Sequence, residues 1–478
     1  MCIVDAADFF VDGTKLANVT RFRYLKAVSC VGYGKRVFDS HDLTVPTKVA
    51  VYNQYLVPLV VYGSETWTVC QHQVRELRTL QQRHLRIILN IKWDDFVRNE
   101  EVLRRANVED IEISSFYNYC RYDWYQNDKI VTISVYTKKK DLRLEDIILE
   151  LIDGKDFNAI FILGIKSFQI HIVLSNVVTC QQVRISGATG KADVLLTKET
   201  SGVKWTDLGQ GLLGNNSLKL HKDRESRLWD CRVVSVEAVT HNCKLFCCEL
   251  PDGIVMRVPI GHHIHLHRDV EGMKISRPYT VVLPSLRFSL DEREHDGRRF
   301  YLMIKIYPDG TLTPTLSAID VGDILQISDY SGDFKESRLI EARDIILIAG
   351  ERGLTQMIRL VRRAVLESSS TETSVKLLFA NNQEKDILWK QQLNEMVETA
   401  SQRFQVYYTV SQPTPEWDGY EGRVSLEMLL EILPPPPSAG HERKLLICIC
   451  GPDPFTHHIV STLKDLSYAE NMIHAFLG

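Results

Sequence analysis

Residues 344–366 read DIILIAGERGLTQMIRLVRRAVL, an apolar run at 344–349 followed by an amphipathic stretch at 357–366. The same alternation recurs over the last third of the chain: 375–379 before 387–399, then 404–410, then 445–450 before 455–466. Strands that alternate with helices build a parallel, doubly wound sheet. We therefore predict such a sheet over residues 340–478.

Two regions upstream are rich in strands instead. Residues 225–334 contain these candidate strands: 232–238, 245–250, 263–267, 301–307 and 324–328. A closed antiparallel barrel is the natural arrangement for them. Residues 122–213 hold short alternating runs at 130–136, 167–174 and 191–197, broken by Gly and Asp turns, which indicate an antiparallel β-sandwich. We expect Trp205 to be a packing anchor of this sandwich.

The first part of the chain, residues 1–115, is expected to be mostly helical. Apolar positions recur there at near-helical spacing while arginines occupy the other faces: Val74, Leu77, Leu80, Leu85 and Ile88 against Arg75, Arg78, Arg83 and Arg86. A basic face can contact nucleic acid, but acidic residues nearly balance basic ones over residues 1–120. That balance favours a solvated surface helix.

Composition excludes several classes of protein. The chain has 478 residues, 44% of them hydrophobic, and a net charge of −4, which gives no overall electrostatic reason to bind nucleic acid or an acidic membrane. The longest apolar run, 55–62, is too short to span a bilayer. The N-terminus lacks the basic residues of a secretory signal, and eleven cysteines without a regular CxxC pair fit reduced thiols. We expect a cytoplasmic location, with association to the endoplasmic reticulum left open.

The string RPYT, Arg277–Thr280, combines a planar cation, a rigid turn residue, an aromatic ring and a hydroxyl. A guanidinium can hold a pyrophosphate through two parallel hydrogen bonds, a phenol ring can lie against an isoalloxazine, and a threonine hydroxyl can reach flavin N5. The same string also occurs in ordinary turns. Its surroundings decide between these interpretations.

RPYT is preceded by VPIGHHIHL (258–266) and followed by YLMIKIYPDGTLTPTL (301–316), an order that resembles the FAD-binding half of the cytochrome b5 reductase family. The resemblance implies that Arg277, Pro278, Tyr279 and Thr280 form the flavin motif. It also implies that Met303, Lys305 and Tyr307 face the cofactor from one side of a strand and that Leu312 and Thr313 cap the pyrophosphate. The family's GKMS loop reads GTLT here, so a weaker grip on FAD is expected.

Three later strings complete the resemblance: LLFANNQEKDILW (377–389), YYTVSQPTPEWDGYEGRVS (407–425) and CGPDPF (450–455). It implies that Cys450, Gly451 and Pro452 place the nicotinamide and that Gly350, Gly353 and Thr355 belong to the nicotinamide loop. Thr280 and Cys450 are then the residues nearest the hydride transfer. Cys450 also ends an apolar run, so a core role is the alternative.

Two departures from the family bear on activity. The pattern GTGxTPM is replaced by GERGLTQM (350–357), with charged Glu351 and Arg352 where threonine stands and Gln356 where proline stands. Because hydride transfer needs close positioning, this loop is expected to reduce turnover more than FAD binding. Ser411 stands where single-domain members have an acidic residue, so we expect NADH use with NADPH tolerated.

Two further resemblances concern the upstream regions. YDWYQNDKIVTISVYTK (122–138) and VLLTKETSGVKWTDLG (194–209) resemble the CS domain, as in the multidomain reductases that join haem, CS and reductase modules. VYNQYLVPLVVYGSETWT (51–68) and IKWDDFVRNEEVLRRA (91–106) resemble the tail of LINE-type retrotransposon reverse transcriptases. No YADD-like aspartate pair and no HPGG-type haem histidine occur in the sequence. We expect a truncated or fused gene product whose reductase module survives.

Metal binding is not expected. His263, His265 and His267 alternate on one strand face without a second ligand group nearby in sequence, and Cys243, Cys247 and Cys248 have loose spacing. We interpret these residues as strand and packing positions.

The sequence therefore predicts a multidomain α+β and α/β flavoprotein with parts at 1–115, 122–213, 225–334 and 340–478. It should pass electrons from NADH or NADPH through FAD to a one-electron acceptor such as cytochrome b5 haem. One alternative is a CS-domain interaction protein with a silent reductase half. Another is a nucleic-acid-binding remnant that uses the basic helix.

Overall fold

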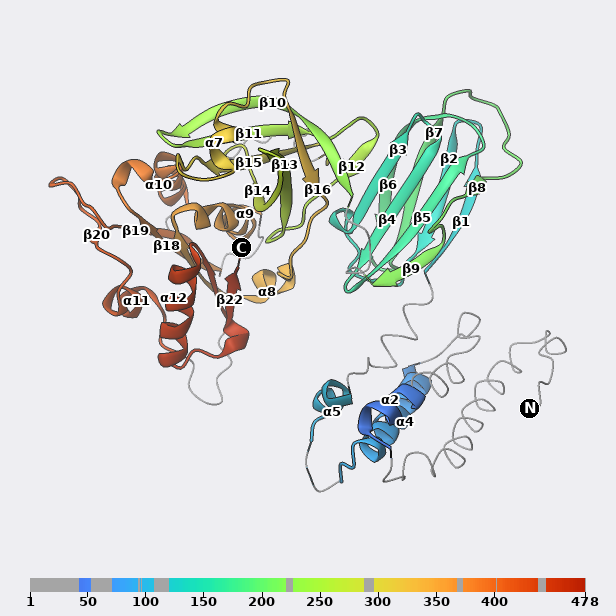
Figure 1. Ribbon diagram of the computed structural model, residues 1–478, viewed down its shortest axis with the longest axis horizontal. Coiled ribbons are helices and arrows are strands. Elements are labelled where there is room, and N and C mark those ends of the chain that lie inside the picture. The colour runs from blue at the N-terminus through green and yellow to red at the C-terminus, as the bar shows by residue number, and fades with distance from the viewer. Residues whose placement is uncertain are drawn as a thin grey trace.

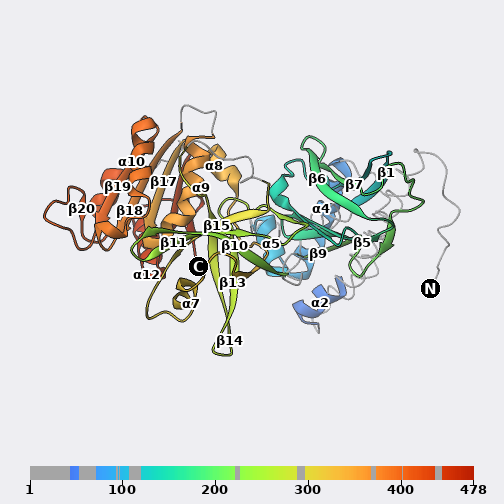
Figure 2. The same ribbon diagram turned by 90° about the horizontal axis from the view of Figure 1, so that it is seen from above.

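The computed structural model describes residues 43–52, 71–92, 95, 97–106, 120–220, 227–287, 296–367, 373–400, 402–436 and 444–477. A parallel sheet, a barrel and a sandwich follow one another along its long axis (Figures 1 and 2). Within the described ranges, no helix is long and apolar enough to cross a membrane.

The N-terminal part contains helices, as predicted. They are α2 (Val45–Val51), α4 (Gln71–Ile88) and α5 (Asn99–Ala106). A small apolar core holds them together, with Tyr52, Leu85 and Val102 buried. Residues 53–68 of the retroelement-like stretch and the side chains of Arg75 and Arg78 lie outside the described residues.

The predicted sandwich is confirmed. One sheet has the order β1 (Arg121–Gln126), β2 (Ile130–Tyr136), β7 (Lys191–Lys198), β6 (Val178–Ser186). A short helix, η6 (Leu144–Asp146), leads into the second sheet. Its strands follow in the order β3 (Ile147–Ile152), β4 (Asp156–Leu163), β5 (Lys166–Leu174) and β8 (Gly209–Gly211), and β9 (Ser217–Leu220) also pairs with β5. Alternate residues of β7 are buried, as expected when one face of a strand lines a core. Trp205 is buried in that core, as predicted.

A short strand from the barrel region completes the second sheet. β12 (Ile254–Met256) pairs antiparallel with β3, with Val255 opposite Leu149. Next to this pairing, the buried carboxylate of Glu150 accepts a hydrogen bond of 3.0 Å from Trp229 Nε1 and pairs with Arg227. The strand pairing and these contacts of Glu150 therefore join the sandwich to the barrel.

The predicted barrel is also confirmed and closes in the order β10 (Leu228–Thr240), β11 (Cys243–Glu249), β15 (Arg299–Lys305), β14 (Met273–Val282), β13 (His263–Val270), β16 (Ile324–Ser328). A short helix, α7 (Thr313–Ser317), follows β15. The prediction of Pro278 as a turn residue was wrong, because RPYT lies within β14. β14 pairs with β15 only at Val281 and Val282, which leaves an edge beside Pro278 where a missing N–H is tolerated.

The C-terminal part is the predicted doubly wound sheet. All its strands are parallel, in the order β20 (Tyr420–Glu421), β19 (Phe404–Val410), β18 (Ser374–Asn381), β17 (Asp344–Gly350), β21 (Leu445–Cys450), β22 (Ile473–Phe476). Helices α9 (Leu354–Val365) and α10 (Lys390–Thr399) share a core with Ile345 and Leu347 of β17. Helices α11 (Leu426–Ile432) and α12 (Asp453–Asp465) share the opposite core with Ile346 and Ile348. Shorter helices are α8 (Glu336–Glu341), η9 (Glu351–Gly353), η10 (Glu384–Asp386) and η11 (Glu470–Met472).

Candidate cofactor site

The RPYT residues lie on β14 beside β13, with Thr280 opposite His263 and Pro278 opposite His265. Arg277 and Tyr279 are two residues apart and therefore share one face of the strand. The Arg277 side chain is exposed, and Nη1 donates to the Ser276 carbonyl at 2.9 Å. A guanidinium has five N–H donors, so most of them remain available to an anionic ligand.

Of the alternating residues Met303, Lys305 and Tyr307, the first two lie on the neighbouring strand β15. Met303 is buried in the core shared with the parallel sheet, and Lys305 ends the strand. Tyr307 lies beyond β15, so the predicted strand to residue 307 was two residues too long. Lys305 Nζ lies 5.7 Å from the centre of the Tyr307 ring, which keeps the two side chains together.

The segment after Tyr307 is held by Thr313. The Tyr307 N–H donates to Thr313 Oγ1 at 3.0 Å, and the Thr313 hydroxyl donates back to the Tyr307 carbonyl at 3.1 Å. Leu312 is buried in the barrel core. The Thr313 hydroxyl is therefore engaged in shaping the loop, and Leu312 packs rather than exposing its side chain.

Glycines let two loops of the parallel sheet approach closely. A Cβ at Gly353 would lie 2.0 Å from the carbonyl oxygen of Cys450, and one at Gly451 would lie 2.6 Å from the Phe455 ring. At Gly350 the distance to the same ring would be 3.0 Å. Because the Gly353 contact is with backbone, only glycine fits there, whereas a side chain at Gly350 or Gly451 would require the Phe455 ring to move.

These loops sit at the carboxyl ends of adjacent parallel strands, where open α/β sheets bind ligands, with Ala349 opposite Cys450. Pro452 precedes α12 at its N-cap position. In the other loop, the Thr355 hydroxyl donates to the Arg352 carbonyl at 2.9 Å. Cys450 is half-buried, and this burial raises the pKa of its thiol to about 12. The thiol therefore stays protonated at neutral pH.

Arg352 connects the barrel motif with the sheet loops. Burial raises the pKa of Tyr279 to about 12, raises the pKa of Tyr307, and raises that of Cys450. The charge of Arg352 opposes the shift in all three pKa values. One exposed cation is thus close to the flavin-motif tyrosine, the tyrosine after β15 and the CGP cysteine, so the structure brings these predicted residues together.

Sequence reasoning assigned Glu351 no contact. Its Oε2 lies 3.1 Å from Lys305 Nζ, so the altered loop is joined to β15 of the barrel by an ion pair. Glu351 also adopts a left-handed backbone conformation, with φ of 47°. The two residues are 46 positions apart on different predicted domains, and no local pattern signals their pairing.

The strand histidines are side by side on β13. The rings of His263 and His265 lie 5.1 Å apart, and His263 Nε2 lies 3.0 Å from the Ser331 hydroxyl. Cys243, Cys247 and Cys248 are buried and form no disulfide within the described residues. Across the described residues, no group of three or more His, Cys, Asp and Glu side chains is placed to hold a metal ion.

The residues present fit a flavin dinucleotide and a nicotinamide dinucleotide. Arg277 offers unused donors, and the glycine contacts of residues 350, 353 and 451 keep side chains out of the loop junction. Arg352 adds a second exposed cation, with no side-chain partner among the described residues. Dinucleotide phosphates need this combination of positive charge and closely approaching backbone.

Family models match three parts of the chain: the CS domain at residues 120–198, the oxidoreductase FAD-binding domain at 230–335 and the oxidoreductase NAD-binding domain at 347–461. Cytochrome b5 reductase 4 of Homo sapiens is 37% identical over 377 residues, covering 78% of this chain and 71% of that protein. The Xenopus tropicalis protein of the same name is 37% identical over 360 residues, covering 74% and 67%.

A solved structure agrees with these matches. The CS-b5R domains of human Ncb5or, in an NAD+ form, are 36% identical to this chain with a TM-score of 0.68. The match covers 75% of this chain and 100% of that one.

Proposed function

The chain belongs to the cytochrome b5 reductase family, and from this premise we propose how its own residues serve the reaction. It is an NAD(P)H-dependent, FAD-containing oxidoreductase that delivers electrons to a one-electron acceptor. Bound FAD supplies the conversion of a two-electron hydride donor into single electrons. The acceptor we propose is the haem of cytochrome b5.

The observation that carries the assignment of residues is the position of Arg352 near Tyr279, Tyr307 and Cys450. It supports a single reaction site between the barrel and the carboxyl end of the parallel sheet. Arg277 would hold the FAD pyrophosphate, while Tyr279 and Thr280 would orient the flavin ring. Pro278, Met303 and Lys305 would shape its surroundings.

On the sheet side, Gly350, Gly353 and Thr355 would hold the nicotinamide loop in place. Cys450, Gly451 and Pro452 would fix the nicotinamide ring against the flavin. Because the Cys450 thiol is neutral, its role is positioning near the hydride path and not proton transfer. Leu312 would support the pyrophosphate cap through packing, and Thr313 would support it through its bonds to Tyr307.

A steady-state assay tests this function. The purified full chain is mixed with NADH and oxidised cytochrome b5, and haem reduction is followed by absorbance. We expect turnover that depends on the chain and is lost in Arg277→Ala. Absence of haem reduction by flavin-loaded wild-type protein would refute cytochrome b5 as the acceptor.

We also propose that the CS sandwich binds an external protein through its four-stranded sheet. The second sheet is occupied at one edge by β12 of the barrel region. The outer strand β1 exposes alternate residues, including Tyr125, which is 56% exposed. Loss of partner binding in Tyr125→Glu, with reductase activity retained, would support this role.

A further inference from the structure

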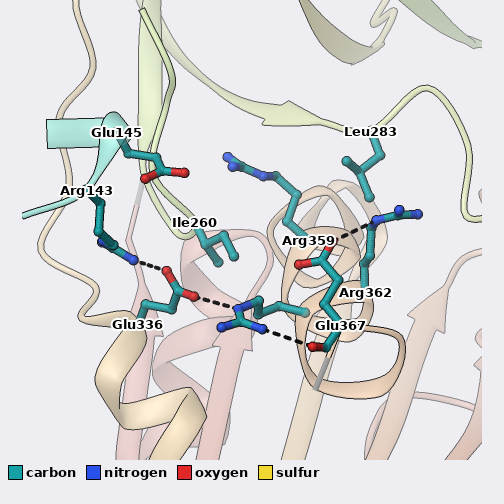
Figure 3. Close-up of a pocket in the computed structure, with 9 residues that line it drawn as sticks. Arg143, Glu145, Ile260, Leu283, Glu336, Arg359, Arg362 and Glu367 are labelled. Atoms are coloured by element: carbon teal, nitrogen blue, oxygen red, sulfur yellow. Dashed lines mark hydrogen bonds and ion pairs between the residues drawn. The ribbon is translucent and has the colours of Figure 1, made fainter. Parts of the chain in front are cut away.

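A charged cavity of about 350 Å³ lies where the three parts of the protein meet. The sandwich contributes Arg143 and Glu145, and the barrel contributes Ile260 and Leu283 (Figure 3). The parallel-sheet part contributes the remaining residues, Glu336, Arg359, Arg362, Arg363 and Glu367. None of the residues assigned to FAD or NAD(P)H lines this cavity.

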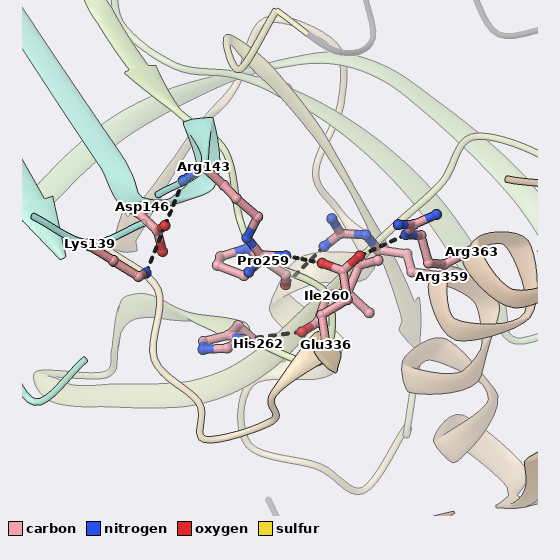
Figure 4. Close-up of polar contacts among 9 residues, drawn as sticks. All are labelled: Lys139, Arg143, Asp146, Pro259, Ile260, His262, Glu336, Arg359 and Arg363. Atoms are coloured by element: carbon pink, nitrogen blue, oxygen red, sulfur yellow. Dashed lines mark hydrogen bonds and ion pairs between the residues drawn. The ribbon is translucent and has the colours of Figure 1, made fainter. Parts of the chain in front are cut away.

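Most of the charges in the lining are paired. Glu336 accepts from Arg363 Nε at 2.7 Å and is also bonded by Arg143, which joins the sandwich to α8 and α9 (Figure 4). Arg362 Nε lies 3.0 Å from Glu367. Four arginines against three glutamates leave the lining with one excess positive charge.

Arg359 is the cation with unused hydrogen-bonding capacity. Its Nη1 donates to the Pro259 carbonyl at 3.1 Å, and its other N–H groups have no partner within the described part of the chain. Burial lowers the pKa of Arg359 to about 10, and the charges of Glu145, Glu336 and Glu367 act in the opposite direction. The guanidinium is therefore charged at neutral pH in a poorly hydrated position.

Two neighbouring groups also have unused hydrogen-bonding capacity among the residues that the structure describes. Arg362 Nη1 is buried with no hydrogen-bond partner in the described residues. The Glu145 carboxylate and the Arg359 guanidinium reach into the cavity from facing sides without forming an ion pair (Figure 3). Buried donors without partners are unfavourable, so the cavity is suited to a group that accepts hydrogen bonds.

We propose that this cavity binds a small anion that carries a phosphate or carboxylate group. The planar forks of Arg359 and Arg362 match the oxygen geometry of both groups. The volume corresponds to roughly ten water molecules, enough for a small metabolite but not for a dinucleotide. Because all three parts supply lining residues, the bound anion would lie at their junction, with its donors on α9.

Isothermal titration calorimetry on the flavin-loaded full chain tests the proposal. Inorganic phosphate and citrate are titrated separately at constant ionic strength, which distinguishes the phosphate source from the carboxylate source. We expect one saturable site for at least one of the two probes. No saturable binding of either probe would overturn the proposal and would indicate that water alone fills the cavity.

Two variants test whether the anion binds in this cavity, and they should change its affinity in opposite directions. Arg359→Gln is expected to weaken binding by roughly tenfold or more, because it removes a charged donor. Glu145→Gln is expected to tighten binding, because it removes a negative charge and keeps the backbone carbonyl that Tyr330 bonds. Arg299→Gln is the matched control, since it breaks an exposed ion pair with Glu249 elsewhere.

Arg359→Gln and Glu145→Gln test the proposal independently, so one of them is sufficient if the other fails to fold. Unchanged affinity in Glu145→Gln would contradict the proposal even without a usable Arg359 variant. Equally weakened anion binding in Arg299→Gln would also contradict the proposal, because the effect would then come from the overall charge of the protein and not from the cavity.

Discussion

The carboxylate of Glu351 lies 3.1 Å from the ammonium group of Lys305, and this ion pair joins the loop at residues 350–357 to the last residue of β15. The Lys305 side chain is only 14% exposed and that of Glu351 is 34% exposed, so the pair is partly shielded from water. Shielding makes such a pair stronger than one at the open surface. We therefore expect the Glu351 carboxylate to oppose an anionic dinucleotide that approaches Lys305.

Glu351→Gly is expected to speed flavin reduction by NADH several-fold. The change frees Lys305 and also relieves a left-handed backbone, which costs a non-glycine residue about 1 kcal/mol. Rapid-mixing absorbance measurements give the rate. Glu351→Gln is the control, because it removes the charge and keeps the backbone conformation. Slower reduction in Glu351→Gly would show that the pair assists the reaction.

Arg277→Ala is expected to release FAD. Among the described residues, the side chain has one hydrogen bond, to the Ser276 carbonyl, so its loss should cost little stability. The flavin-to-protein ratio after gel filtration measures the effect. Arg268→Ala on the neighbouring strand β13 is the control and should keep its flavin. Stoichiometric flavin in Arg277→Ala would remove the residue from the site.

Ser411→Asp is expected to make the enzyme selective for NADH. Ser411 is exposed just after β19, and its N–H donates to the Asn381 carbonyl at 3.0 Å, so the loop should tolerate the change. A carboxylate there would bind ribose hydroxyls and repel a 2′-phosphate. We expect kcat/KM for NADPH to fall by roughly tenfold or more, given one unfavourable charge contact. Ser411→Ala is the control, and equal loss with both cofactors would contradict the assignment.

Acidification is expected to destabilise the barrel strand beside RPYT. Burial lowers the pKa of His263, His265 and His267, and neighbouring histidine charges lower the first two further. Below the unfolded value of about 6.5, the unfolded chain binds protons that the folded chain does not, so stability falls as pH falls. Thermal unfolding and flavin retention between pH 7 and 5 provide the measurement.

His265→Gln should reduce this acid sensitivity, because it removes one titrating group from the row. His457→Gln is a suitable control, since His457 is exposed on α12. If His265→Gln and the wild type lose stability equally between pH 7 and 5, other groups cause the pH dependence.

Much of the fold follows from local patterns. The apolar runs of β17, β19 and β21 are long, β-branched and bounded by helices, and the structure places all three within one residue of the predicted ends. β12 was not predicted, because three residues without alternation carry no strand signal. Its pairing with β3 depends on how two separate parts of the chain meet, which local periodicity does not encode.

In the candidate site, too, some residues could be predicted from the sequence and some contacts could not. The RPYT and CGP strings could be located from their resemblance to a family, but Pro278 was taken for a turn residue and lies within β14. Proline is uncommon inside strands, so the residue type alone did not indicate one. The ion pair between Lys305 and Glu351 requires the distance between two elements, and the position of Arg352 requires the loop conformation. Neither contact has a sequence signal, since charged residues pair with many partners.

Anaerobic addition of NADH to the purified, flavin-loaded chain tests the central claim most directly. We predict that the visible flavin absorbance bleaches and that oxidised cytochrome b5 then restores it while its haem becomes reduced. A yellow protein whose absorbance is unchanged by excess NADH would contradict this account and would instead indicate an interaction protein with a silent reductase half.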